Sequence, residues 1–357
     1  MNKKLALFPM TREQAAMVRY SSLLQGYDIC HCFVPSFLRH FEGVDVSRRD
    51  GGEEVGSAIN LYNKTDLAKS ETLFIDYDDK LEELSIYKDV ICNAKESGME
   101  VVLSDLLAHR INEESLTWPI DAPMAEKPGE DVLYKIRVPV ITVFSQGIRT
   151  DQFAIELTLR SYFTNIGYKV SQIGSIDASR FFGFNSIPSF MYEPRDAYEK
   201  ILRFNYYVRS LVNQEKPELL IIGVPGATMG YSDQLLQGLG LLPFMVSTAV
   251  RADLSILSMY YAKYNVPFFD EMTKHFRYKL SCPASFFSIS SVGVMPDPGS
   301  ERFKLTYFEA DSNHVLHSIN SEIEHGEYNL FNALNSDSIN AMCVAAQKAL
   351  SDNPRFM

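Results

Sequence analysis

A short segment between two expected regular elements has the residue types of an anion-binding loop. Residues 143–153, VFSQGIRTDQF, join an apolar run that predicts a strand to an amphipathic run that predicts a helix. Phosphate-binding proteins place glycine-rich loops at such junctions, where backbone N–H groups at the helix start point at the anion. The candidate anion- or nucleotide-binding residues of this loop are Ser145, Gln146, Gly147, Arg149 and Thr150.

The loop lacks the lysine of a phosphate loop. Counting the spacing G-x-x-x-x-G-K-[ST] from Ser145 puts Asp151 at the lysine and Gln152 at the magnesium ligand, and no other register restores a lysine. A carboxylate facing a triphosphate costs about 1 kcal/mol per charge pair at ~4 Å in water. We therefore predict a degenerate phosphate loop and no cofactor. Two alternatives stay open: ATP or GTP binding with Mg²⁺, in which Arg149 replaces the lysine, and a plain strand-to-helix turn.

Two further charged residues follow the next expected strand. Asp177 and Arg180, in GSIDASR, could face the same crevice, because ligands of parallel sheets bind at the carboxyl ends of the strands. Asp253, in AVRADLSIL, is a weaker candidate for the acid of a magnesium site. These carboxylates are equally typical of turns and helix caps.

A second polar loop, RRDGGEEVG, could cover a ligand in a crevice between domains. Its candidate residues are Arg48, Arg49, Asp50, Gly51 and Gly52. Long polar loops at strand ends are frequent functional sites, although Asp-Gly is also an ordinary turn signal.

The acidic run DYDD is better explained by a structural role than by a catalytic or metal-binding one. In DYDD, residues 76–79, we expect Asp78 or Asp79 to cap the following helix, with a magnesium site as the alternative. We predict no metal site elsewhere. The sequence shows no catalytic motif that pairs a nucleophile with a general base, so the catalytic residues stay unknown.

The order of the expected elements predicts an α/β protein of two domains. Residues 1–112 alternate strands with helices and predict a Rossmann-like parallel sheet, residues 113–134 predict a linker, and residues 135–357 restart the alternation as a P-loop-NTPase-like domain. Within the last part, PFMVSTAV and SFFSISSVGV each predict a strand. The stretch 179–210, rich in Phe and Tyr, predicts either a large core or a partner or dimer surface.

Composition excludes several classes of function. The 357 residues carry 34 Lys plus Arg against 45 Asp plus Glu, a formal charge of −11, and no basic cluster, which argues against nucleic-acid and membrane-surface binding. No apolar run is long enough to cross a bilayer. Five cysteines in a chain of this size favour thiols over a disulfide framework, so we expect a cytoplasmic protein.

The combination of RRDGGEEVG, VFSQGIRTDQF, LLIIGVPG and AVRADLSIL resembles a family of accessory proteins of peptide maturation systems. Its members are encoded beside radical-SAM maturases of cysteine-rich ribosomal peptides. The resemblance spans nearly the whole chain and implies a pathway, with the precursor peptide and the maturase as partners. In that family the loop has more glycine and often a lysine before the phenylalanine, where this chain has Gln152.

The leading hypothesis is a non-hydrolysing accessory protein that binds precursor peptide, maturase or a second copy of itself. The alternatives are an ATP- or GTP-dependent enzyme of the same pathway that uses the 145–152 loop, and a small-molecule-binding module at the interdomain crevice.

Overall fold

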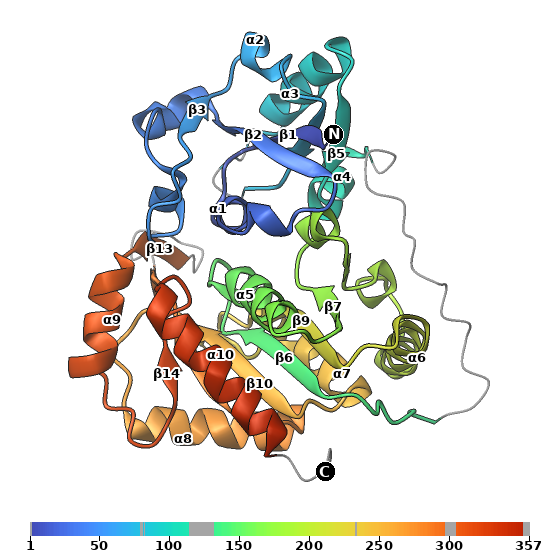
Figure 1. Ribbon diagram of the computed structural model, residues 1–357, viewed down its shortest axis with the longest axis vertical. Helices are drawn as coiled ribbons and strands as arrows, with labels where there is room; N and C mark the ends of the chain where they lie inside the picture. Colours follow the sequence, from blue (N-terminus) through green and yellow to red (C-terminus); the bar gives the residue numbers. More distant parts are fainter. Residues whose placement is uncertain are drawn as a thin grey trace. The chain divides into compact units, whose positions relative to one another are not determined.

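The computed structural model describes residues 2–78, 81, 83–113, 132–232, 234–296 and 305–352. The chain divides into two compact units, Met1–Asp121 with Asp177–Gly183, and Ala122–Ile176 with Phe184–Met357 (Figure 1). The expected linker, 113–134, lies almost wholly outside the described residues, and the predicted domain boundaries stay a prediction.

The first unit is built on one parallel sheet in the order β3-β2-β1-β4-β5. This is the strand order of a Rossmann-like half, as the sequence predicts. Its strands are β1 (Lys3–Phe8), β2 (Tyr27–Val34), β3 (Ile59–Leu61), β4 (Thr72–Ile75) and β5 (Glu100–Leu103).

The helices of this unit are α1 (Arg12–Arg19), α2 (Lys64–Leu67), α3 (Leu84–Glu96) and α4 (Asp105–Ile111). Its 3₁₀ turns are η1 (Ser21–Leu23), η2 (Ser36–Phe41), η3 (Val46–Arg49) and η5 (Asp177–Phe182), of which η5 follows β7 in the sequence. Thr11 caps α1, since its Oγ1 accepts a 3.2 Å hydrogen bond from the N–H of Gln14. Apolar residues of α3, α4 and the central strands form the core, among them Phe8, Ile75, Tyr87, Val90 and Leu107.

The second unit is built on a larger parallel sheet in the order β14-β11-β10-β6-β9-β7-β8. Its strands are β6 (Val140–Ser145), β7 (Val170–Gly174), β8 (Asn185–Ser186), β9 (Leu219–Ala227), β10 (Leu254–Met259), β11 (Phe286–Ile289) and β14 (Leu330–Phe331). An antiparallel hairpin, β12 (Val292–Pro296) and β13 (Leu305–Glu309), is separate from it.

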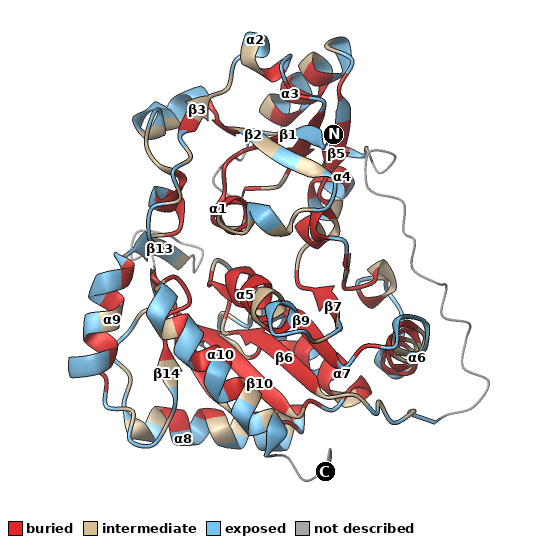
Figure 2. Cartoon of the chain, viewed as in Figure 1, coloured by how far each residue is buried: buried red, intermediate tan, exposed pale blue. Residues whose placement is uncertain are grey.

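Helices cover both faces of this sheet, so β6 and β10 are buried throughout (Figure 2). One face packs α5 (Gln152–Asn165) and α10 (Ser336–Ser351). The other packs α6 (Ala197–Glu215), α7 (Leu241–Ala249), α8 (Val266–His275) and α9 (Ser312–Ser321). Irregular turns η6 (Ser189–Met191) and η7 (Gln237–Gly240) and a π-helical segment η8 (Phe276–Leu280) complete the unit.

Two strand predictions in this unit are wrong. PFMVSTAV lies in helix α7 and not in a strand, because Pro243 falls in the first helical turn, where a missing N–H costs nothing. SFFSISSVGV forms two strands, β11 and β12, which belong to different sheets and separate at Ser290 and Ser291.

The aromatic stretch 179–210 is mainly core. Phe181, Phe182, Phe184, Phe204 and Tyr207 are all buried. Tyr192 and Tyr198 are its exposed large side chains, at 60% and 52%. Among the described residues, no helix is long and apolar enough to span a membrane.

Candidate functional site

The candidate loop leaves the carboxyl end of β6, in the middle of the larger sheet, and enters α5. Both neighbouring strands hold it. The N–H of Gln146 donates to the carbonyl of Ser258 on β10 at 2.8 Å. The Ser145 hydroxyl donates to the carbonyl of Gly226 on β9 at 3.1 Å. The structure thus brings the predicted loop to the edge of a parallel sheet where ligands of this fold bind.

Two tyrosines from the end of β10 fill the inside of the loop. The Gln146 Oε1 accepts from the N–H of Tyr260 at 3.0 Å and lies 3.1 Å from the Tyr264 hydroxyl, which is also 2.8 Å from the Tyr260 carbonyl. The Tyr260 hydroxyl donates to the carbonyl of Ile148 at 2.9 Å. A Cβ on Gly147 would lie 2.1 Å from that hydroxyl. The loop's glycine therefore makes room for a phenol.

Gln152 is the first residue of α5 and falls at the magnesium-ligand position of the phosphate-loop spacing. Its side chain is buried, and its Nε2 donates both to the carbonyl of Val143 at 2.9 Å and to the carbonyl of Val224 at 2.8 Å. The amide thus uses both protons to join β6 to β9, and it carries no positive charge. We find its role structural.

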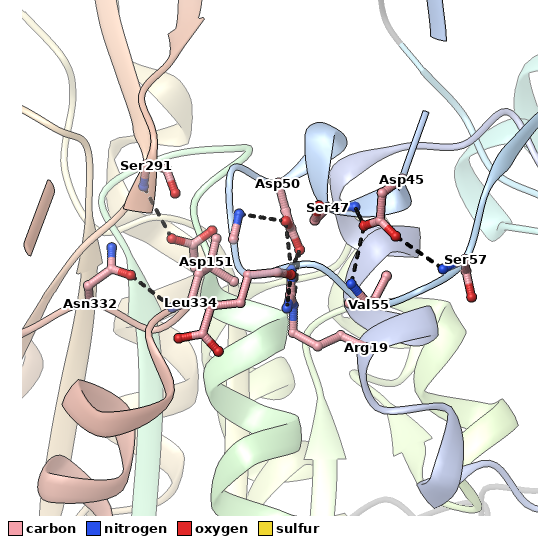
Figure 3. Close-up of polar contacts among 12 residues, drawn as sticks. Arg19, Asp45, Ser47, Asp50, Val55, Ser57, Asp151, Ser291, Asn332 and Leu334 are labelled. Atoms are coloured by element: carbon pink, nitrogen blue, oxygen red, sulfur yellow. Dashed lines mark hydrogen bonds and ion pairs between the residues drawn. The ribbon is translucent and has the colours of Figure 1, made fainter. Parts of the chain in front are cut away.

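Asp151 places a carboxylate at the start of α5. The side chain is 4% exposed, and its Oδ2 accepts from the N–H of Ser291, 3.4 Å away (Figure 3). A helix start attracts negative charge through its partial positive charge. Here the Asp151 side chain supplies the negative charge at the start of α5.

Arg149 and Thr150 complete the loop. Arg149 has a left-handed backbone, with φ of 65°, and its guanidinium lies 5.0 Å from the ring of Tyr307 on β13. The distance suits a cation–π interaction. Thr150 is buried, and its Oγ1 has no hydrogen-bond partner among the described residues.

A buried acid on α5, Glu156, was not among the sequence candidates. Its Oε2 accepts from the N–H of Ser175 at 3.0 Å, whereas Oε1 is buried without a partner among the described residues. A Cβ on Gly223 of β9 would lie 2.2 Å from its Cδ, so a glycine there makes space for the carboxyl. Burial raises the pKa of Glu156 to about 8. The signal in the sequence is a single acid amid the apolar residues of this helix.

The other predicted residues of the site, Asp177 and Arg180, belong to the first unit. Asp177 caps α4, because its Oδ2 accepts from the N–H of Asp105 at 2.9 Å. Arg180 lies 3.9 Å from the Asp105 carboxylate. Asp253 lies at the amino end of β10, where it accepts from the N–H of Val140 at 3.0 Å. The loop follows the opposite, carboxyl end of these strands, so Asp253 cannot hold a metal there.

The loop 48–52 is fixed within the first unit. Arg49 is buried, donates from Nε to the carbonyl of Met10 at 2.8 Å and stacks over Phe41. Asp50 pairs with Arg19 at 2.9 Å (Figure 3). Burial raises the pKa of Asp50 despite that guanidinium.

Arg48 is exposed, whereas Gly51 takes a left-handed backbone with φ of 76° and Gly52 donates its N–H to Asp50 Oδ1 at 2.9 Å. Just before and after this loop, the Asp45 carboxylate accepts N–H groups of Ser47, Val55, Gly56 and Ser57. Of the five predicted residues, Arg48 is the one with an exposed charge.

The expected helix cap in DYDD is wrong for Asp78. Helix α3 begins after Glu83. The backbone N–H of Asp78 donates to the Tyr87 hydroxyl at 2.9 Å, and that hydroxyl donates to the Asp78 carbonyl at 3.3 Å. Asp79 lies outside the described residues. In the same segment, burial and then the Glu13 carboxylate raise the pKa of Asp76 to about 7. Within the described residues, no group of three or more His, Cys, Asp or Glu side chains is arranged to hold a metal.

Comparisons with known proteins identify a fold. No family model matches the sequence, and no curated protein matches it. The structure resembles that of a DUF1611 family protein from Anabaena variabilis, with a TM-score of 0.59 at 12% sequence identity, over 99% of this chain and 100% of that one. A pseudomurein peptide ligase type C from Methanothermus fervidus has a TM-score of 0.26 at 11% identity, over 80% of this chain and 44% of that one, which is too low to support an inference.

Proposed function

We propose that the protein is a non-hydrolysing accessory protein in the maturation of a ribosomally synthesised peptide, which binds the precursor peptide, a radical-SAM maturase or a second copy of itself. The observation that carries the non-hydrolysing part is the Gln152 amide. It donates to the carbonyls of Val143 and Val224 from the position where the resembled family often has a lysine. The pathway and the partners are inferred from the family resemblance of the sequence.

Charge and space both support this proposal. An incoming triphosphate would meet the buried Asp151 carboxylate at the start of α5, and a carboxylate repels phosphate more strongly as the local dielectric constant falls. The Tyr260 hydroxyl takes up the space beside Gly147 that a phosphate loop leaves for the anion. Retaining the P-loop-like fold without its anion site suits a protein that works by binding partners.

A second candidate function is an ATP- or GTP-dependent enzyme of the same pathway. It is favoured by the buried Thr150 hydroxyl, which has no partner among the described residues and lies next to the start of a long helix. Arg149 would then bind the phosphates in place of the missing lysine. The third possibility, a small-molecule site between the domains, stays a prediction.

Nucleotide binding and turnover distinguish the first two candidates. We expect no thermal shift with ATP or GTP plus Mg²⁺, whereas a ligand at ~100 times its Kd would add about 2.7 kcal/mol to the unfolding free energy. Steady turnover that Arg149→Ala abolishes, and that the exposed control Arg39→Ala leaves intact, would overturn the proposal.

The pathway is tested separately. A tagged full-length protein should retain a co-expressed precursor peptide or maturase, and an unrelated peptide of equal charge serves as the control. Failure to retain either partner would remove the pathway assignment.

A further inference from the structure

An exposed apolar surface lies on the second unit, in η7 and α7, which both pack against β9. Four large side chains within nine positions of η7 and α7 are exposed: Leu236 at 46%, Leu239 at 48%, Leu241 at 59% and Phe244 at 39%. Leu241 and Phe244 are three residues apart on α7 and so share a helix face. We call these four residues the leucine surface. Single exposed leucines need no explanation, but four so close together do.

The backbone that presents this surface is strained. Gln237, Gly238, Leu239 and Gly240 have φ values of 44°, 74°, 54° and 68° in succession. A left-handed conformation costs a non-glycine residue about 1–2 kcal/mol, and Leu239 adopts it while exposing its side chain. The Lys279 ammonium holds this turn, donating to the Leu239 carbonyl at 2.7 Å. Strain kept by specific contacts is a feature of functional segments.

The two segments that meet at this surface contain no acidic residue. From Gln234 to Ala252 the sequence has no acidic residue and one basic residue, Arg251. The neighbouring segment from Met272 to Pro296 also lacks acids. Its basic residues include Arg277, which is exposed, and Lys279, which contacts η7. These two segments contact each other through α7 and η8, and on a chain of net charge −11 they present Arg277 as an exposed cation.

We propose that the leucine surface binds a peptide segment of a partner that has an apolar face and acidic flanks. Apolar side chains of the peptide would cover Leu239, Leu241 and Phe244, and its carboxylates would lie beside Arg277. This inference deepens the proposed function, because it takes the bound segment to belong to the precursor peptide. An amphipathic helix seated on an apolar surface is a common recognition mode.

Binding of a synthetic peptide tests this assignment. The probe is a labelled amphipathic peptide with leucines at helical spacing and glutamates at the flanking positions, and its anisotropy is measured with the full-length protein. We expect binding that Phe244→Ser weakens about tenfold or more. Arg277→Glu should weaken binding of this peptide and leave a glutamine-flanked version little changed. Both side chains are exposed, so neither substitution should affect folding.

The matched control is Val344→Ser, which removes a 56% exposed apolar side chain on α10 and should leave affinity unchanged. The proposal is overturned if the acidic peptide binds no better than its lysine-flanked version, or if Val344→Ser weakens binding as much as Phe244→Ser. Self-association that Phe244→Ser abolishes would identify a second copy as the occupant and also overturn it. Arg149-dependent nucleotide turnover would contradict the proposed function and leave this binding result unaffected.

Discussion

Individual side chains decide what the candidate loop can do, and each acts through a partner far away in sequence. Gln152 lacks the charge of lysine, but its structural role depends on the carbonyl of Val224, some seventy positions later. Glu156 is similar, because the carboxyl fits only where Gly223 has no side chain. Sequence spacing identifies the missing lysine and does not identify these partners.

The buried Glu156 predicts a specific pH dependence of stability. The folded pKa is about 8 and the ordinary value is 4.5, so between these values the folded protein keeps a proton that the unfolded chain has released. The unfolding free energy should therefore fall as pH rises through this window and level off above it. At about one to two kcal/mol per pKa unit, the loss is on the order of a few kcal/mol.

Glu156→Gln should remove this slope, because the amide stays neutral and its oxygen can still accept from Ser175. In urea unfolding we expect the variant to match the parent near about pH 5 and to exceed it near about pH 8.5. Glu215→Gln, an exposed position at the end of α6, is the control. Equal pH slopes for the parent and Glu156→Gln would contradict a proton held at this site.

At the scale of the elements, periodicity predicts the α/β order well because most strands and helices bury one consistent face. The strand β6 and the helix α5 form on either side of the loop, where VFSQGIRTDQF predicts a strand and a helix. The failures have local causes. Helix α7 contains Val and Thr, which favour strands, but it packs between α6, β9 and η8, and tertiary burial outweighs propensity.

The Gln152 amide connects α5 to β6 and β9 through its two hydrogen bonds, so a substitution there should loosen the packing of these elements. Gln152→Glu would turn a double donor into an acceptor that faces two carbonyls, and a buried unpaired charge is costly. We expect the unfolding free energy at neutral pH to fall by about 2 kcal/mol or more, measured by urea unfolding.

Gln214→Glu, on the exposed end of α6, makes the same chemical change in solvent and should alter stability little. If the two variants were equally stable, the two hydrogen bonds of Gln152 would not hold the strands together.

At the scale of the whole molecule, the chain crosses between the two units more than once, because each unit is made of two separate segments. Residues 177–183 lie between two segments of the second unit, which end at Ile176 and resume at Phe184, but belong to the first unit. Phe181 is fully buried there, with its ring centroid 5.1 Å from that of Tyr27 and 5.1 Å from that of Phe74. Its carbonyl accepts from the N–H of Gln25 at 2.8 Å. The sequence shows no composition change that marks this segment.

Phe181→Ala should therefore destabilise the first unit although the substitution lies beyond β7 of the second. Truncating a buried Phe costs about 3–5 kcal/mol, because it removes apolar burial and leaves a cavity between rings on β2 and β4. We expect faster amide hydrogen exchange in Tyr27–Val34 and Thr72–Ile75 of the full-length variant, with little change in β9. Tyr192→Ala, which removes an exposed ring, is the control. Faster exchange confined to β6 and β9 would assign Phe181 to the second unit, because a core residue loosens first the sheet on which it packs.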